Sequence, residues 1–149
     1  MIRKALMVGI PIGAMFLLPR LAPLVVKVRT VGGTKVKGRD RLRAAVEVTN
    51  TGDVDLTNVR ITVTGGTQPG VYEIPIISQF VDIPAGATVR IPETGLAESD
   101  VIPADAPTGT WGCFAWANWD TQQAFTKIDN AWEVREPIKK AEISIVGVG

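Results

Sequence analysis

The sequence predicts an all-β protein built as a sandwich of two antiparallel sheets. Apolar and polar residues alternate with a period of two along most of the chain after Leu24, as in strands that bury one face. Gly, Pro, Asn and Asp separate these runs at short intervals, as turns between strands require. No helical period is visible after residue 26. Seven or eight strands at this spacing favour a sandwich, and a barrel is the structural alternative.

The predicted strands follow one another with little chain between them. The run 42–50 places Leu42, Ala44, Val46 and Val48 on one face, with charged or polar side chains opposite. The residues 96–109 form the one long polar connection. In chain order the predicted strands are 24–31, 42–50, 57–65, 70–83, 87–92, 110–119, 130–134 and 141–148.

Composition fits one globular domain and excludes several kinds of chemistry. Hydrophobic residues make up 46% of the 149 residues and the net charge is +1, so we expect no specific nucleic-acid binding. Histidine is absent, which removes the commonest general base and metal ligand. The single cysteine, Cys113, cannot form an intrachain disulfide. The sequence therefore predicts no catalytic residue, no cofactor, no metal and no small-molecule substrate.

The first 26 residues are predicted to be an apolar, helical anchor. Arg3 and Lys4 precede an uncharged run from Ala5 to Pro19, and a helix of that length spans ~22 Å, short of a ~30 Å hydrocarbon core. The segment is therefore a membrane-inserted helix, an arm buried against partner subunits, or an uncleaved export signal. Its anchoring side chains are Leu6, Val8, Ile10, Ile12, Met15, Phe16, Leu17 and Leu18.

A basic run follows the predicted anchor. Seven Lys or Arg residues and one acid, Asp40, lie between residues 27 and 43. Such a run is a solvated strand face, or it contacts lipid headgroups or acidic partners. The residues assigned to that contact are Lys27, Arg29, Lys35, Lys37 and Arg39.

Three sequence blocks carry a family resemblance. "VEVTNTGDVDLTNVRITV", "IPAGATVRI" and "IPADAPTGTWGCFAWANW" resemble the bacterial and archaeal cell-adhesion-related module called CARDB, and other immunoglobulin-like (Ig-like) modules. The resemblance covers residues 24–147 and implies an Ig-like sandwich over 27–149, in which the first block is a strand pair with its turn. The family usually has Tyr where this chain has Trp111. An apolar anchor before one such module is also similar to small phage virion proteins.

Acidic and aromatic residues supply the remaining candidates. Asn50, Asp53 and Asp55 are read as a turn rather than a calcium site, because tight turns require these residue types. Carboxylates in and beside the long polar connection are read as solvated rather than as a glycosidase pair; these are Glu93, Glu98, Asp100 and Asp105.

The four tryptophans divide between core and surface by strand alternation. Trp111 and Trp119 share one face and are assigned to the core, whereas Trp116 or Trp132 is expected at an interface between subunits.

These observations predict a non-enzymatic structural protein, held by residues 2–26 in a membrane or in neighbouring subunits of an assembly. The expected assembly is a phage virion, in which the chain is a minor capsid, membrane or appendage component. Its expected partners are other protein subunits and membrane lipid, and its expected location is the virion or a membrane. The alternative is a secreted or cell-surface adhesion module that binds glycan or protein through exposed tryptophans.

Overall fold

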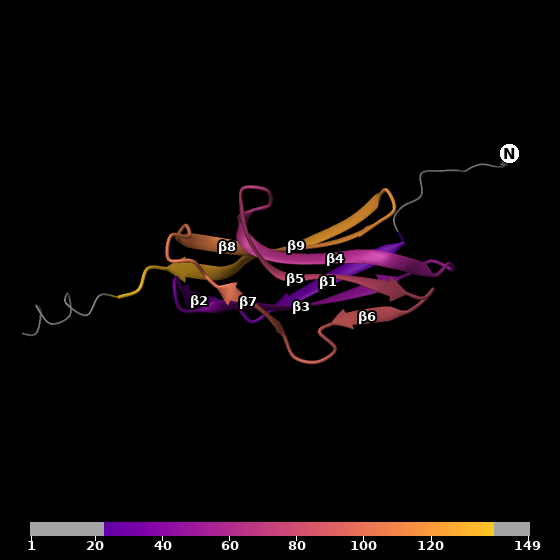
Figure 1. The fold of residues 1–149 in the computed structure, drawn as a ribbon, viewed down its shortest axis with the longest axis horizontal. Coiled ribbons are helices and arrows are strands. Elements are labelled where there is room, and N and C mark those ends of the chain that lie inside the picture. Colours follow the sequence, from indigo (N-terminus) through magenta and orange to yellow (C-terminus); the bar gives the residue numbers. More distant parts are fainter. Residues whose placement is uncertain (1–22, 139–149) are drawn as a thin grey trace, which may run out of the picture.

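The computed structural model describes residues 23–138, and these residues form strands without any helix. The all-β prediction is therefore confirmed (Figure 1). The strands are β1 (Leu24–Thr30), β2 (Gly33–Val36), β3 (Arg41–Asn50), β4 (Leu56–Gln68), β5 (Tyr72–Ile83), β6 (Thr88–Ile91), β7 (Ala97–Val101), β8 (Gly109–Trp119) and β9 (Gln122–Arg135).

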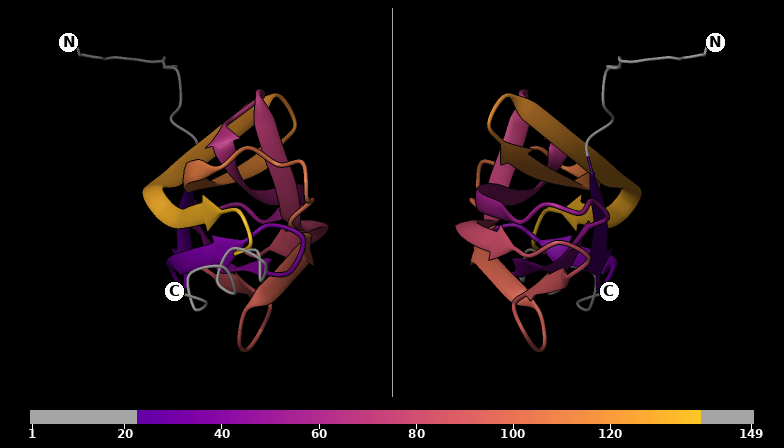
Figure 2. Two further views of the ribbon diagram at one scale, coloured as in Figure 1. Left: turned by 90° about the vertical axis from the view of Figure 1, so that its left-hand side faces the viewer. Right: turned by 90° about the vertical axis from the view of Figure 1, so that its right-hand side faces the viewer.

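The strands form two sheets around one core. One sheet has the order β1-β3-β6, with β7 also paired to β3, and the other has the order β2-β9-β8-β4-β5. In the end-on views of Figure 2 both sheets curl around the space between them. The side chains that fill this space are fully buried and come from both sheets; the largest are Trp111, Trp132, Leu42, Ile61, Ile83 and Ile102.

One strand pair is parallel, which corrects the prediction of purely antiparallel sheets. β2 pairs with the end of β9, from Gly33 beside Trp132 to Val36 beside Arg135. The chain leaves β1 in one sheet and enters the other sheet at Gly32 and Gly33. A Cβ on Gly32 would lie 2.9 Å from the Ala131 carbonyl oxygen, and Gly33 has φ +118°. Glycine is therefore required at this crossing.

Two further differences concern the boundaries of elements. β7 lies inside the stretch 96–109, which was predicted to be a connection without strands. β1 begins at Leu24, and Leu24 and Val26 are buried opposite Asn50 and Val48. The predicted domain boundary at residue 26 is therefore too late, because residues 24–26 belong to the first sheet.

The rest of the anchor prediction lies outside the described residues, and so does the predicted strand 141–148. The anchoring side chains between Leu6 and Leu18 are all among these undescribed positions. Between residues 23 and 138 there is no helix with the length and apolar character to cross a bilayer.

Candidate functional site

The acidic turn after β3 uses its polar atoms to hold the backbone. The Asn50 side chain is fully buried. Its Nδ2 donates to the carbonyl oxygens of Val54 (2.8 Å) and Ile83 (3.0 Å), and its Oδ1 accepts from the Gly52 N–H (3.0 Å). Asp55 accepts from the Ala85 N–H at 2.9 Å. Among the described residues no group of three His, Cys, Asp or Glu side chains could hold a metal ion. The turn therefore acts as a structural element.

The basic run does not form one surface. Lys27 and Arg29 are exposed on β1, and Lys35 is half-buried on β2. Lys37 is only 7% exposed, and its Nζ donates to the Ala106 carbonyl at 2.7 Å and pairs with Glu136 at 3.1 Å. The assignment of Lys37 to headgroup or partner contact is therefore wrong, because its ammonium group is enclosed and already bonded.

Arg39, the last residue assigned to headgroup or partner contact, is exposed and pairs with its neighbour Asp40 at 3.3 Å. The hydrogen bond from the Arg39 guanidinium lowers the pKa of the Asp40 carboxyl, and the hydrogen bond from the Val36 N–H lowers it further. Arg39 and Asp40 both lie in the turn between β2 and β3, so the Arg39 guanidinium is already paired within its own chain.

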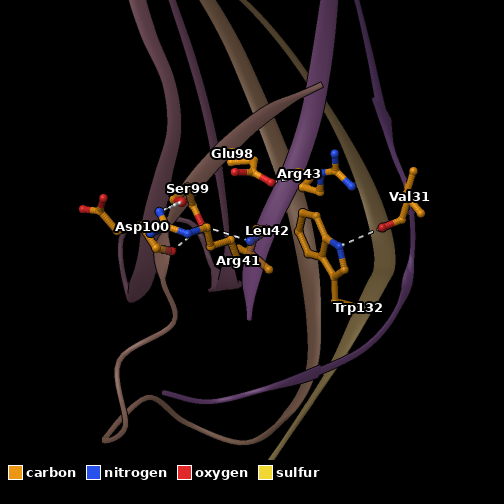
Figure 3. A network of polar contacts seen from close by, with 8 residues as sticks. All are labelled: Val31, Arg41, Leu42, Arg43, Glu98, Ser99, Asp100 and Trp132. Atoms are coloured by element: carbon orange, nitrogen blue, oxygen red, sulfur yellow. Dashed lines mark hydrogen bonds and ion pairs between the residues drawn. The ribbon is translucent and has the colours of Figure 1, made fainter. Parts of the chain in front are cut away.

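Side chains of Ser99 and Glu98 help to pair β7 with β3. The buried Ser99 hydroxyl accepts from the Leu42 N–H (2.9 Å) and donates to the Asp100 carbonyl (2.6 Å), while Arg41 donates to the Ser99 carbonyl (3.0 Å). Glu98 pairs with Arg43 at 3.4 Å across the same strands. Figure 3 shows this network between the two strands. The hydrogen bonds and the ion pair of this network join β7 to β3. The carboxylates of Glu98 and Asp100 are exposed.

Trp132 lies in the core, which corrects its assignment to an interface. It is 2% exposed, and its indole N–H donates to the Val31 carbonyl at 3.2 Å (Figure 3). The side chain is therefore enclosed by its own chain and is not available to a partner.

Trp116 lies on the opposite, outer face of the five-stranded sheet, where it meets a phenylalanine. β8 and β9 pair with Trp116 opposite Phe125. The ring centroids are 5.1 Å apart at an interplanar angle of 44°, and Phe125 is 46% exposed. Phe114, on the same face of β8, lies 6.4 Å from Trp116 and is itself only 4% exposed. We call these three residues the aromatic face.

Polar side chains border the aromatic face on both sides along the strands. On one side the strand register places Arg60, Asn118 and Gln123 in a row across β4, β8 and β9. On the other side a depression of about 630 Å³ begins at Phe114 and Phe125. Its polar lining is Thr67, Gln68, Thr110, Lys127, Asp129 and Asn130.

This arrangement combines flat apolar rings with hydrogen-bonding groups at their edges. A ring pair with one exposed member offers stacking surface, and amide, hydroxyl and charged groups beside it can bond to ligand hydroxyls. The depression has one carboxylate in its lining, Asp129, which pairs with Lys127 at 3.3 Å. Glycoside hydrolysis ordinarily uses two carboxylates, and the lining of this depression holds one. Sequence reasoning found Trp116 but missed Phe114 and Phe125.

Neither a family model nor a curated protein matches the chain. Among solved structures, the fold is similar to part of a family 123 glycoside hydrolase from Clostridium perfringens, studied for glycolipid glycan hydrolysis. The identity is 11% and the TM-score 0.51, over 77% of this chain and 27% of that chain. A β-glucosidase from Erythrobacter marinus matches with 20% identity and a TM-score of 0.38, over 70% of this chain and 14% of that one. The chain thus spans about a quarter or less of these neighbours.

The structural comparison corrects one prediction. The chain was expected not to be an enzyme, and the first neighbour is an enzyme that contains this fold. The prediction is therefore withdrawn. At 11% identity the similarity shows the fold alone.

Proposed function

We propose that the chain is an Ig-like sandwich module that binds glycans on the outer face of its five-stranded sheet. The observation that carries this proposal is the pair of rings on that face, the half-buried Trp116 and the exposed Phe125, whose centroids lie 5.1 Å apart. Sugar rings present apolar C–H faces and polar edges, so a ring pair bordered by hydrogen-bonding groups suits them.

Three features support a glycan over a protein partner. The rings are bordered by Arg60, Asn118 and Gln123, whose planar groups can donate to and accept from vicinal hydroxyls. The depression beside the rings is open and lined by both polar and apolar groups. Finally, the similar portion of the Clostridium perfringens structure belongs to a glycoside hydrolase that was studied for the hydrolysis of glycolipid glycans.

The assembly role predicted from the sequence rested on the apolar anchor, most of which lies outside the described residues. The described residues offer a binding face, so the adhesion alternative becomes the leading proposal. A secreted or cell-surface location would accompany it.

A glycan array followed by titration calorimetry tests the proposal. Trp116→Ala and Phe125→Ala should each weaken the binding of an array hit about 10-fold, because losing one stacking partner costs ~1.4 kcal/mol. The matched control is Val25→Ala, since Val25 is 44% exposed on the other sheet. Binding that survives both aromatic substitutions, or an array without hits, would refute the proposal.

A further inference from the structure

A further aromatic ring lies on the outer face of the five-stranded sheet, away from the aromatic face. Phe80 belongs to β5, the edge strand of this sheet, and it is 65% exposed. It lies directly opposite Arg60, and opposite residues of an antiparallel pair project from the same side of a sheet. The next residue, Val81, is opposite the fully buried Val59. Phe80 therefore points away from the core, on the side that carries the aromatic face.

The strand register gives the separation between Phe80 and the aromatic face. Arg60 on β4 lies between Phe80 on β5 and Asn118 on β8, and these strands are neighbours in the sheet (Figure 1). Trp116 and Phe125 form the next row, two residues along the strands. With strands ~4.8 Å apart and ~3.3 Å per residue, the Cα atom of Phe80 lies ~12 Å from that of Trp116 and ~16 Å from that of Phe125. One sugar ring is too small to stack at both places.

Polar side chains lie between the two aromatic positions. Thr62 on β4 is opposite Ser78 on one side and Trp116 on the other, and Arg60 is two residues away on the same strand face. Arg60 is exposed, and no carboxylate within residues 23–138 forms an ion pair with it. Its guanidinium therefore has N–H donors available to a ligand.

Apolar rings separated by hydrogen-bonding groups suit a carbohydrate chain. A protein interface has a continuous apolar centre, and here Arg60 and Thr62 interrupt the apolar surface. Successive sugar rings present C–H faces that are separated by hydroxyl groups. Because both aromatic positions lie on one face of one sheet, the ligand must run straight for ~16 Å. Cello- and chito-oligosaccharides are extended chains of this kind, whereas malto-oligosaccharides coil.

We propose that Phe80 is a second stacking platform, and that the sheet binds an extended β-linked oligosaccharide that crosses the strands from Phe125 to Phe80. This second platform depends on the glycan binding proposed above, and it determines the length, direction and shape of the ligand. One sugar ring stacks on Trp116 and Phe125, and a later ring of the same chain stacks on Phe80. The Arg60 guanidinium donates to hydroxyl groups between them.

NMR titration of the full chain with cello- and chito-oligosaccharides tests the dependence on ligand length. Phe80→Ala should weaken the binding of the hexasaccharides about 10-fold, because they lose one stacking partner. It should change the binding of the disaccharides less than about 2-fold, because these reach only Trp116 and Phe125. Trp116→Ala should weaken the binding of both lengths. Val71→Ala is the matched control, since Val71 is 71% exposed in the turn between β4 and β5, and it should leave both unchanged.

Two further comparisons test the ring and the shape of the ligand. Phe80→Tyr keeps an aromatic ring and should bind the hexasaccharides within about 2-fold of the natural chain. Maltohexaose contains as many glucose units as cellohexaose but coils, so it should bind no more tightly than cellobiose. Circular dichroism checks that each variant is folded.

The outcomes distinguish this platform from the glycan site itself. Equal effects of Phe80→Ala on disaccharides and hexasaccharides would overturn the second platform, and maltohexaose binding as tightly as cellohexaose would overturn the extended ligand. Glycan binding that is lost in Trp116→Ala would support the proposed site in either case. If the glycan array gives hits that depend on Trp116 while no cello- or chito-oligosaccharide binds, the extended ligand is wrong and the glycan site remains.

Discussion

Gly65 tests whether the core is packed as the structure shows. It lies on β4 opposite Cys113 and faces the space between the sheets. A Cβ at this position would lie 2.5 Å from Leu42 Cδ1 and 2.8 Å from Trp132 Cζ3. Overpacking a core costs ~1–3 kcal/mol, while replacing Gly by Ala gains ~0.4–1 kcal/mol from the unfolded chain. Gly65→Ala should therefore lower the free energy of unfolding by about 1–2 kcal/mol.

Combining this change with Leu42→Ala separates the clash from other effects. Leu42→Ala alone should cost ~2–5 kcal/mol, because it leaves a cavity in a fully buried site. In that background the contact with Leu42 Cδ1 is gone and the one with Trp132 Cζ3 remains, so Gly65→Ala should cost less than it does in the natural chain. The coupling free energy is then ~1 kcal/mol, above the ~0.5 kcal/mol scatter of independent sites.

The assay is urea denaturation of the four chains of this cycle, with an unchanged m-value as the check that the denatured state is the same. Gly70→Ala is the matched control. Gly70 has φ +77°, and a Cβ added to it would have no atom within 4 Å, so its cost of ~1 kcal/mol is backbone strain. That cost should add to the cost of Leu42→Ala. If Gly65→Ala costs the same with Leu42 and with Ala at position 42, the packing argument is refuted.

Three further predictions concern single buried groups. Asn50→Ala should cost ~3 kcal/mol in urea denaturation, because three backbone partners lose their bonds; a loss below ~1 kcal/mol would contradict the structural role of the turn. Lys37→Ala should cost ~2 kcal/mol because it leaves the Ala106 carbonyl unpaired, whereas Glu136→Ala should cost less than ~1 kcal/mol because Glu136 is 70% exposed; equal losses would count against this assignment. Burial raises the pKa of the Cys113 thiol to about 12. Its unfolded pKa is ~8.5, so this contribution to stability is complete below about pH 8.5 and declines as the pH rises towards 12, by at most ~1.4 kcal/mol per pH unit. Cys113→Ala should remove that decline when unfolding is measured at pH 7 to 10.5, and an unchanged decline would exclude the thiol as its cause.

Local sequence signals were sufficient for the fold class. The alternation in β3 and β4 and the turn residues between them act over a few positions, so they can be read without knowing which strands pair. The buried faces of these strands follow the alternation, with Leu42, Ala44, Val46 and Val48 all buried. The turn was also read correctly, because an Asn side chain that bonds its own backbone is a local structure.

Pairings that depend on distant residues could not be read in this way. β7 has the sequence "AESDV" without apolar alternation, and its pairing depends on the Ser99 hydroxyl bonding to Leu42, 57 positions away. β2 has four residues, and its parallel partner is the far end of β9. In both cases tertiary contacts determine a strand whose own sequence has little strand preference.

Predicting the aromatic face required knowing where β9 begins. The sequence predicted only residues 130–134 as a strand. So short a strand does not show whether Trp132 lies on its inner or its outer face. The observed β9 starts at Gln122, directly after the turn that contains Asp120 with φ 52°. From this start the side chains alternate as far as Ile128, and Phe125 lies opposite Trp116 on the outer face. A bulge that contains Asn130, with φ 57°, then separates this stretch from the buried Trp132. The available sequence signal for this tight turn was Asp120 itself, directly after Trp119, because Asp tolerates a positive φ.

The side chains of β8 are arranged against the usual preference of a sandwich strand, and this favours a role in binding. Three of its inward positions hold the small residues Cys113, Ala115 and Ala117, all fully buried. Phe114 and Trp116 lie on the outer face, where Phe114 is covered and only 4% exposed and Trp116 is half-buried. The core does not need these outward rings, because Trp111 and Trp132 fill it from the same hairpin. Keeping Trp116 and a 46% exposed Phe125 at the surface forgoes the ~1.5–3 kcal/mol that burying a large apolar side chain provides. Stability alone therefore does not account for the position of Trp116 and Phe125, whereas the proposed glycan binding would.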